Sequence, residues 1–164
     1  MIDKKNGEEI ADFQECLLAW FQASQRPLPW RTTYTPYHVW ISEIMGQQTQ
    51  MDRVSLYFSR WIEQFPDIAA VAAAPEQAIL KAWEGLGYYS RARNLQRAAR
   101  LVVSDFQAVL PASKAELERL PGVGRYTAAA IVSIAFGHVE ATLDGNIRRV
   151  LSRFYNIELP SGSP

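Results

Sequence analysis

A turn with two glycines, lying between two helical stretches, constrains this chain more than any other feature. The turn is Pro121-Gly122-Val123-Gly124, and a helix expected over 113–120 precedes it, with a Ser-x-x-Glu capping spacing at Ser113 and Glu116. Proline ends that helix, the glycines tolerate positive φ and close backbone approach, and an alanine-rich helix follows. A turn of this kind presents bare N–H groups at a helix N-terminus, which suits a phosphate oxygen. The pattern therefore has two interpretations of equal weight, a phosphate-binding turn and a simple corner between helices.

The rest of the chain is also helical in pattern. No segment alternates convincingly with period two, and the nine prolines fall at junctions or at the tail. Apolar residues recur at helical spacing, and a lone Cys16 falls on the apolar face of the first helix, where we expect it in a core. The sequence therefore predicts an all-α protein. The helices expected besides those flanking the turn are 10–21, 37–50, 54–65, 75–85, 90–102 and 144–154.

Composition limits the size and the partners of the protein. With 164 residues and 48% hydrophobic content, the chain can hold one core, or one domain with part of another. Its formal net charge is zero, although residues 81–100 hold four more basic than acidic residues. A single cysteine excludes an intrachain disulfide and a four-cysteine metal site. The polar N-terminus and the lack of a long apolar run predict an intracellular protein that does not enter a membrane.

The glycine turn occurs twice in the sequence. An offset of 37 residues places Gly85, Gly87 and Tyr89 over Gly122, Gly124 and Tyr126. This spacing predicts two helix-turn-helix units of one shape, the first followed by an arginine-rich helix. Chance similarity between helical segments is the alternative.

Two carboxylates are the candidates for chemistry. Glu43 shares a helix face with Trp40 and Val39, where desolvation would raise its pKa and allow it to act as a general acid. The alternative is an ordinary exposed glutamate. Asp144 has the position of a helix N-cap, or of a fixed carboxylate that stabilises a positively charged sugar. A pair of this kind is used to cleave glycosidic bonds.

Four segments in this order resemble the adenine DNA glycosylase family, which removes adenine mispaired with 8-oxoguanine. They are 42–50, 85–95, 120–128 and 143–150. The resemblance implies a six-helix domain over 30–136 that contains a helix-hairpin-helix at 113–135. It implies that 1–29 and 137–164 are the remaining parts of a second, split helical domain that lacks its iron–sulfur loop.

The resemblance also implies roles for individual residues. Glu43 would protonate the purine of a flipped-out adenosine, Asp144 would stabilise or capture the sugar cation, and Tyr126 would help position Glu43 or the base. The base pocket would be lined by Arg26, Leu28, Trp30 and Arg31. The expected contacts with double-stranded DNA are Gln48, Tyr88, Arg91, Gly122, Val123, Gly124 and Arg125. The backbone carbonyls of Leu120 and Val123 would hold a monovalent cation.

The differences from the family are informative. Lysine replaces Tyr126 in the related endonuclease III branch, and a tyrosine cannot form a Schiff base, so we expect base removal without backbone cleavage. Gly46 stands where the family has a bulky apolar residue; as a mid-helix glycine it would cost about 1 kcal/mol and weaken lesion recognition. One cysteine cannot hold the family's 4Fe–4S cluster, so we expect no cofactor in this chain. A missing C-terminal half or a second copy is an expected partner.

Three functional hypotheses follow from the sequence. The first is an adenine DNA glycosylase of the cytoplasm or nucleoid, which the presence of both Glu43 and Asp144 favours. The second is a helix-hairpin-helix fragment that binds DNA with little or no turnover. The third, and least favoured, is a helical scaffold without nucleic acid, which predicts no salt-dependent DNA binding.

Overall fold

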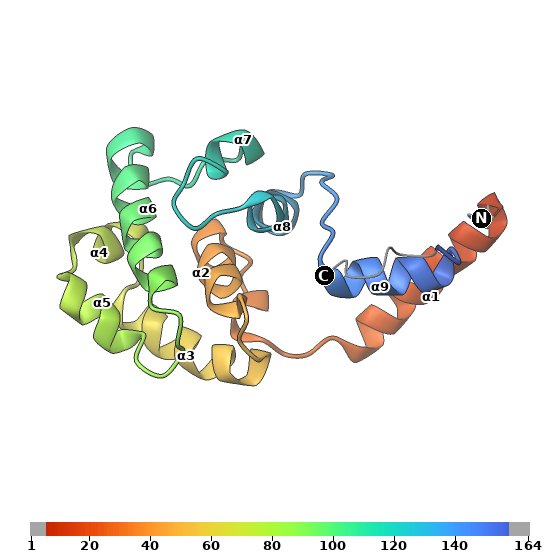
Figure 1. Ribbon diagram of the computed structural model, residues 1–164, viewed down its shortest axis with the longest axis horizontal. Coiled ribbons are helices and arrows are strands. Elements are labelled where there is room, and N and C mark those ends of the chain that lie inside the picture. The colour runs from red at the N-terminus through yellow and green to blue at the C-terminus, as the bar shows by residue number, and fades with distance from the viewer. Residues whose placement is uncertain (1–5, 158–164) are drawn as a thin grey trace. The chain divides into compact units, whose positions relative to one another are not determined.

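The computed structural model describes residues 6–157 (Figure 1). These residues form helices and no strand, which confirms the all-α prediction. The ends of the expected second domain, 1–5 and 158–164, lie outside the described residues. The helices are α1 (Gly7–Ser24), the 3-10 helix η1 (Pro29–Arg31), α2 (Pro36–Gly46), α3 (Met51–Gln64), α4 (Ile68–Ala73), α5 (Glu76–Ala82), α6 (Ser90–Phe106), α7 (Lys114–Leu117), α8 (Arg125–Phe136) and α9 (Gly145–Phe154).

The chain divides into two compact units. The core unit is Leu28–Thr142, and the terminal unit consists of the described residues up to Pro27 together with those from Leu143 onward. The core unit therefore contains η1 to α8, and the terminal unit contains α1 and α9. The sequence-based division at 30–136 remains a prediction about domains.

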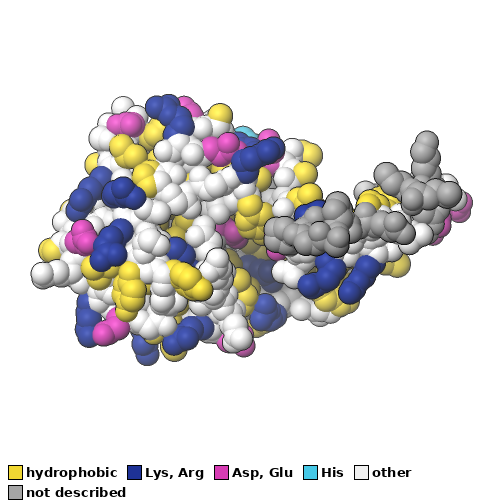
Figure 2. Space-filling view, viewed as in Figure 1, with side chains coloured by type: hydrophobic (Ala, Val, Ile, Leu, Met, Phe, Trp, Pro, Cys, Tyr) yellow, Lys and Arg dark blue, Asp and Glu magenta, His cyan; other side chains and the backbone are white. Residues whose placement is uncertain are grey.

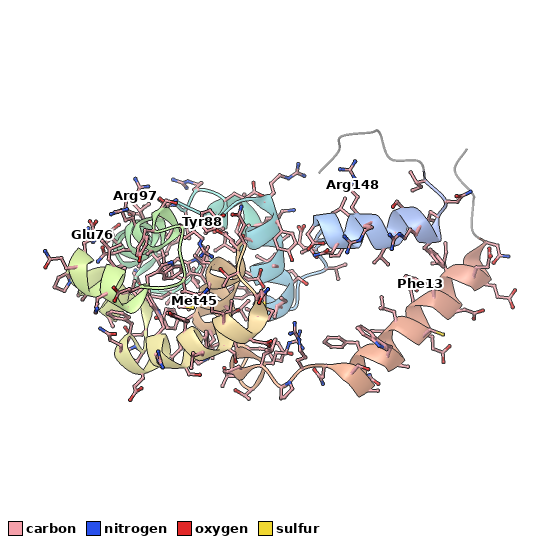
Figure 3. All side chains as sticks on the ribbon, turned by 60° about the horizontal axis from the view of Figure 1, so that its bottom comes forward. Phe13, Met45, Glu76, Tyr88, Arg97 and Arg148 are labelled. Atoms are coloured by element: carbon pink, nitrogen blue, oxygen red, sulfur yellow. The ribbon has the colours of Figure 1, made fainter. Side chains whose placement is uncertain are left out.

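Aromatic and aliphatic side chains fill the core unit. The ring of Trp61 packs edge-to-face on Trp83 with centroids 5.6 Å apart, and its indole N–H donates to Tyr37 Oη at 3.1 Å. Tyr37 in turn donates to the carbonyl of Phe65 at 2.6 Å, so the polar atoms of these buried rings are satisfied. Met45 lies among the helices of this unit (Figure 3). The largest fully buried side chains are Trp40, Trp61, Trp83, Ile41, Ile44, Met45, Ile79, Leu95, Leu117 and Ile131.

Helix α2 begins as predicted and ends earlier. Thr35 Oγ1 accepts from the N–H of His38 at 3.3 Å, and Pro36 occupies the first position, where its missing N–H is not needed. The helix ends at Gly46 rather than at Gln50. The cost of a mid-helix glycine therefore does not apply to Gly46. A Cβ there would lie 3.1 Å from Met51 Cε, the flexible end of a side chain that needs to shift only slightly.

The expected serine cap at Ser113 is wrong, and α6 also begins without a serine cap. Ser113 precedes α7, but within residues 6–157 its hydroxyl accepts no hydrogen bond from the first turn, so the predicted capping box is not formed. Ser90 is the first residue of α6, and Tyr89 occupies the cap position. The helix expected over 113–120 is also shorter, because α7 ends at Leu117 and continues as turns. The sequence additionally missed α4, which Asp67 caps by accepting from the N–H of Ala70 at 2.8 Å.

The terminal unit has a small contact between its helices and a large exposed apolar surface. Phe13 of α1 stacks on Phe154 of α9 with ring centroids 4.2 Å apart. Trp20 is 63% exposed, and Val150 is also exposed. Cys16 is exposed as well, so its expected place in a core is wrong. The other exposed apolar side chains of this unit are Leu17, Leu18, Phe21, Leu143 and Ile157.

No helix of the described chain is both long enough and apolar enough to cross a membrane.

Candidate DNA-binding and catalytic site

Glu43 lies on α2 with its carboxyl largely buried. The side chains of Trp40 and Val39, one turn earlier, are fully buried in the core unit. Burial raises the pKa of Glu43 from its usual 4.5 to about 7. The direction agrees with the sequence prediction and has the same cause, because removing water disfavours the charged form. The carboxyl is therefore partly protonated at neutral pH and able to donate a proton.

Tyr126 lies in the first turn of α8, which packs against α2. Its side chain is 42% exposed. A side-chain contact joins the two helices next to it, because Gln47 Nε2 donates to Thr127 Oγ1 at 3.3 Å. The core unit therefore brings the helix of Glu43 against the helix of Tyr126. Gln47 and Thr127 lie within the segments 42–50 and 120–128, but the sequence interpretation assigned neither of them a role in the site.

Asp144 caps α9 in the terminal unit. One carboxylate oxygen, Oδ1, accepts from the N–H of Ile147 at 2.7 Å, and Asn146 Nδ2 lies 3.4 Å from the other, Oδ2. The structure therefore confirms that Asp144 is the N-cap of α9. The hydrogen bond to Ile147 holds the carboxylate in place and leaves lone pairs on Oδ2. The stabilisation of a sugar cation by this carboxylate is still a prediction. Glu43 and Asp144 belong to different units, and the structure describes each within its own unit.

The residues expected in the base pocket fall into two groups. Leu28 and Trp30 are buried in the core unit, where Trp30 packs edge-on against Phe58 with centroids 5.2 Å apart. Leu28 directly precedes η1 and Trp30 lies within it, and η1 contacts α2, the helix of Glu43. Arg31 is half-buried in η1, whereas Arg26 is exposed in the terminal unit. Three of the four therefore lie in the same unit as Glu43.

The hairpin turn between α7 and α8 uses its two glycines differently. Gly122 has φ +81°, and Val123, which is buried, donates its N–H to the carbonyl of Leu120 at 3.1 Å. Gly124 has ordinary extended backbone, with φ −89° and ψ 176°, and is the N-cap of α8. Arg125 follows as an exposed first residue of the helix. The N-terminus of α8 is therefore preceded by a backbone turn whose cap position carries no side chain.

Cation binding at this turn remains a prediction. A carbonyl oxygen that accepts one hydrogen bond, as that of Leu120 does, keeps a second lone pair, and oxygen ligands suit hard cations. Within the described chain, no group of three or more His, Cys, Asp or Glu residues is arranged to hold a metal ion.

Gln48 and Tyr88, the residues expected to probe the DNA helix, are both exposed. Tyr88 is 62% exposed. Each also has a positive φ, +56° for Gln48 and +48° for Tyr88, a region that residues with a side chain rarely occupy. Both side chains are therefore exposed on segments that connect helices, at positions where the backbone is in an unfavourable conformation.

Arg91 is placed differently from the sequence expectation. It is 8% exposed, and its guanidinium lies within hydrogen-bond distance of six oxygen atoms from two segments of the core unit. The guanidinium is therefore engaged inside the core unit, and its expected contact with DNA stays a prediction that this burial disfavours. The sequence pattern cannot reveal this, because the acceptors on α2 and after it are more than 40 residues away.

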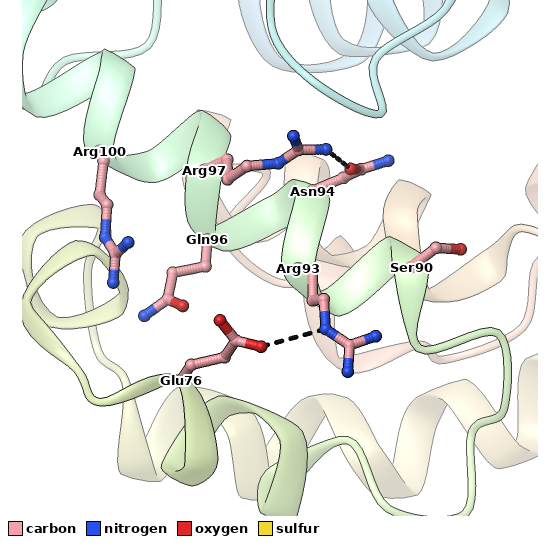
Figure 4. A pocket seen from close by; sticks show the side chains of 7 residues that line it. All are labelled: Glu76, Ser90, Arg93, Asn94, Gln96, Arg97 and Arg100. Atoms are coloured by element: carbon pink, nitrogen blue, oxygen red, sulfur yellow. Dashed lines mark hydrogen bonds and ion pairs between the residues drawn. The ribbon is translucent and has the colours of Figure 1, made fainter.

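The exposed arginines of α6 line a shallow hollow instead. Its volume is about 330 Å³, and it lies between α6 and the start of α5 (Figure 4). Arg93 Nε donates to Glu76 Oε1 at 3.0 Å, and Arg97 donates to Asn94, whose Cβ packs against Gly122 of the hairpin turn. In Figure 2, Lys and Arg side chains are spread among acidic and apolar ones over the visible face of the core unit. The residues lining the hollow are Glu76, Ser90, Arg93, Asn94, Gln96, Arg97 and Arg100.

Comparison with known proteins identifies relatives over most of the chain. Residues 41–162 match the model of the HhH-GPD superfamily base excision DNA repair protein. The chain is 43% identical over 148 residues to the adenine DNA glycosylase of Buchnera aphidicola subsp. Baizongia pistaciae, covering 90% of this chain and 42% of the relative. It is also 43% identical over 154 residues to the adenine DNA glycosylase of Homo sapiens, covering 88% of this chain and 28% of the relative. The chain thus spans less than half the length of these relatives.

Solved structures share the fold. A thermostable thymine-DNA glycosylase superposes with a TM-score of 0.83 at 29% identity, over 88% of this chain and 67% of that one. A non-covalent complex of endonuclease III with DNA superposes with a TM-score of 0.77, over 89% of this chain and 67% of that one. At 24% identity this second likeness shows the fold alone.

Proposed function

The chain belongs to the HhH-GPD superfamily of base excision DNA repair proteins, and we propose that it hydrolyses the N-glycosidic bond of adenine mispaired with 8-oxoguanine or guanine in double-stranded DNA. The observation that carries this proposal is the buried carboxyl of Glu43, with its pKa raised to about 7. A group with that pKa is well matched to proton donation at neutral pH. The names of the relatives, adenine DNA glycosylase, support adenine as the base.

The proposed reaction uses two carboxyl groups in sequence. The adenosine is turned out of the duplex, because its glycosidic bond is otherwise buried in the stack. Glu43 donates its proton to a ring nitrogen of the purine, and the bond from C1′ to the base breaks with both electrons leaving on the base. Asp144 stabilises or captures the cation that forms on the sugar. Water then adds its oxygen to C1′ and gives up a proton, leaving free adenine and an abasic site.

The duplex is held at the hairpin turn and examined by two side chains. The N–H groups at the start of α8 and the open backbone at Gly124 suit phosphate oxygens. Gln48 and Tyr88 contact the helix beside the damaged pair, Tyr88 by wedging into the stack. Their exposure on segments that connect helices supports this role. The base pocket is completed by Arg26, Leu28, Trp30 and Arg31.

The presence of a tyrosine at position 126 favours base removal without strand cleavage. A phenol cannot form the Schiff base through which a lysine amine leads to backbone cleavage, so the product is an intact strand with an abasic site. Tyr126 helps position Glu43 or the base instead. Nicking of the strand without added base or heat would contradict this part of the proposal.

The direct test is adenine release from a duplex that contains adenine opposite 8-oxoguanine, measured in single turnover. We expect release by the unaltered chain and a loss of at least about 100-fold for Glu43→Gln, because general acid catalysis contributes about 10² to 10⁴ in rate. Glu63→Gln, which alters an exposed glutamate on α3, is the matched control and should release adenine normally. Duplex binding without release, at high protein concentration, would favour the DNA-binding fragment instead. Absence of salt-dependent duplex binding would favour the scaffold.

The pKa of Glu43 also predicts how stability varies with pH. Because the folded-state pKa is higher than the unfolded value, the folded chain loses stability as pH rises from about 4.5 to about 7. The loss due to this group is about 3 kcal/mol at pH 8. Glu43→Gln should therefore be more stable than the unaltered chain at pH 8 by up to about 3 kcal/mol, and this advantage should vanish below pH 4.5. Urea denaturation of both chains at the two pH values measures the difference, and an equal difference at both would contradict the raised pKa.

A further inference from the structure

Arg91 joins the two segments that carry the exposed side chains Gln48 and Tyr88. From the first turn of α6, the two N–H groups of its Nη1 are shared among three carbonyls within hydrogen-bond distance, those of Ile44 at 3.1 Å, Met45 at 2.9 Å and Gln47. The two N–H groups of its Nη2 are shared among Thr49 Oγ1 at 3.2 Å and the carbonyls of Leu86 at 3.1 Å and Gly87 at 3.2 Å. One guanidinium therefore bonds to the end of α2 and to the turn before α6 at the same time.

Two of the carbonyls that accept hydrogen bonds from Arg91 lie directly before the exposed residues Gln48 and Tyr88. The carbonyl of Gln47 immediately precedes Gln48, and the carbonyl of Gly87 immediately precedes Tyr88. Gln48 and Tyr88 are the two residues with positive φ and exposed side chains in these turns. A backbone in this region costs roughly 1 to 3 kcal/mol and persists where surrounding contacts determine it. Arg91 provides such contacts on the peptide unit that leads into each residue.

Two more contacts extend this arrangement. The Arg91 guanidinium carbon lies 5.7 Å from the centre of the Tyr88 ring and 5.4 Å from that of Trp83, which is buried, so the cation touches Tyr88 itself. The side chain of Gln47 donates to the carbonyl of Gly122 at 3.4 Å, which links the first segment to the hairpin turn. The segments 47–49 and 86–88 and the hairpin turn thus meet through adjacent hydrogen bonds.

We propose that Arg91 is a positioning residue that holds Gln48 and Tyr88 in a fixed relation, so that the two turns act on the DNA helix as one unit. The benefit to DNA recognition rests on the proposed function, whereas the mechanical link is a property of the chain alone. The link requires a planar fork with donors on two nitrogen atoms. Lysine keeps the charge but concentrates its three donors on one atom, so it cannot reproduce the bonds that two separate nitrogen atoms make to the two segments.

Amide hydrogen exchange of the full chain tests the link without DNA. In Arg91→Lys we expect the amides of 47–50 and 86–89 to exchange at least about tenfold faster, both together, because bonds to a charged donor are among the strong ones. Arg93→Lys is the matched control, since it makes the same change two residues away on an exposed side chain, and it should leave both segments unchanged. Unchanged exchange in Arg91→Lys, or faster exchange in one segment alone, overturns the proposal.

A milder variant covers the case in which Arg91→Lys does not fold. Thr49→Val removes one acceptor of the fork and leaves the carbonyl bonds. It should speed exchange about twofold to threefold in 86–89 as well as in 47–50, since one guanidinium serves both. No change in 86–89 overturns the link.

Duplex binding then tests whether DNA recognition depends on the link that Arg91 makes between the two segments. The effects of Gln48→Ala and Tyr88→Ala on affinity for a duplex with adenine opposite 8-oxoguanine should be non-additive by at least about threefold in the unaltered chain. In an Arg91→Lys background they should become additive. Additivity in both backgrounds overturns the concerted action of the two turns. If the unaltered chain does not bind the duplex, the proposed function fails, and the exchange experiment still decides whether Arg91 joins the segments.

Discussion

The two glycine turns of the core unit share a sequence spacing and use it in different ways. In the turn before α6, Gly85 and Gly87 both have positive φ, and the exposed tyrosine at 88 stands on a turn held from inside by Arg91. In the turn before α8, Gly122 has positive φ, whereas Gly124 is extended and caps the helix. The first turn presents a side chain, and the second presents backbone N–H groups. The sequence repeat therefore predicts two turns between helices, but not two copies of one surface.

The difference arises from what each turn packs against. A Cβ on Gly85 would lie 2.2 Å from Tyr57 Oη, and one on Gly122 would lie 3.0 Å from Asn94 Cβ. A Cβ on Gly87 or Gly124 would meet nothing within 4 Å among the described residues. A neighbouring side chain thus restricts a Cβ at Gly85 and at Gly122, whereas a Cβ at Gly87 or Gly124 meets no neighbour within the described chain. Alanine substitutions at these positions should separate the two roles.

The largest effect is expected for Gly85→Ala. The new side chain would have both an unfavourable φ of +98° and a clash with the Tyr57 hydroxyl, and we expect a loss of about 3 kcal/mol in the free energy of unfolding. In a Tyr57→Phe background the nearest ring atom, Cζ, lies 3.3 Å away, so the cost should fall by about half. Urea denaturation of the four chains of this cycle measures it. An equal cost in both backgrounds would show that backbone strain alone makes glycine necessary here.

A smaller effect is expected for Gly122→Ala, about 2 kcal/mol, from a φ of +81° and contact with the side chain of Asn94. Gly87→Ala is the matched control, because its φ of +72° brings strain without a contact, and about 1 kcal/mol should be lost. Denaturation of both variants provides the comparison. Equal losses would mean that the packing of Asn94 on the hairpin turn contributes little.

The smallest effect on stability is expected for Gly124→Ala. The backbone there is ordinary and the space is open, so the cost of a poorer N-cap and the gain from a stiffer unfolded chain should cancel to within about 0.5 kcal/mol. Duplex affinity should nevertheless fall, because a methyl group at the start of α8 obstructs a phosphate that approaches the backbone. Gly137→Ala, at the opposite end of α8, where a Cβ would likewise meet nothing within 4 Å in the described part of the chain, serves as the control in the same titration. Unchanged affinity for Gly124→Ala would place the phosphate contacts elsewhere.

Much of the helix pattern could be read from the sequence, and the exceptions have identifiable causes. Pro36 and Pro66 mark the start of α2 and the end of α3 through their missing N–H groups. Helix α4, Ile68–Ala73, was missed because it has only six residues, four of them alanine, so that Ile68 and Val71 alone give it a helical spacing. The end of α2 was misplaced because the carbonyls of its last turn and of Gln47 bond to Arg91, which an isolated helix pattern does not reveal.

The candidate site was predictable to the extent that it depends on local chemistry. The raised pKa of Glu43 follows from apolar neighbours one turn away on the same helix, and the structure confirms its direction. Arg91 was misread because an arginine in a basic helix normally faces solvent. Its burial depends on carbonyls that only the packed core unit brings within reach.

The sequence by itself determined the helical class, the position of the two glycine turns and the apolar surroundings of Glu43, since each of these is set by residues within a few positions along the chain. Only the tertiary structure decided that Arg91 faces inward, that Cys16 faces outward, and that Gln48 and Tyr88 are held through one guanidinium. The physical reason is the range of the interactions. Periodicity and proline act over one or two helical turns, whereas burial and hydrogen bonding join segments that are tens of residues apart.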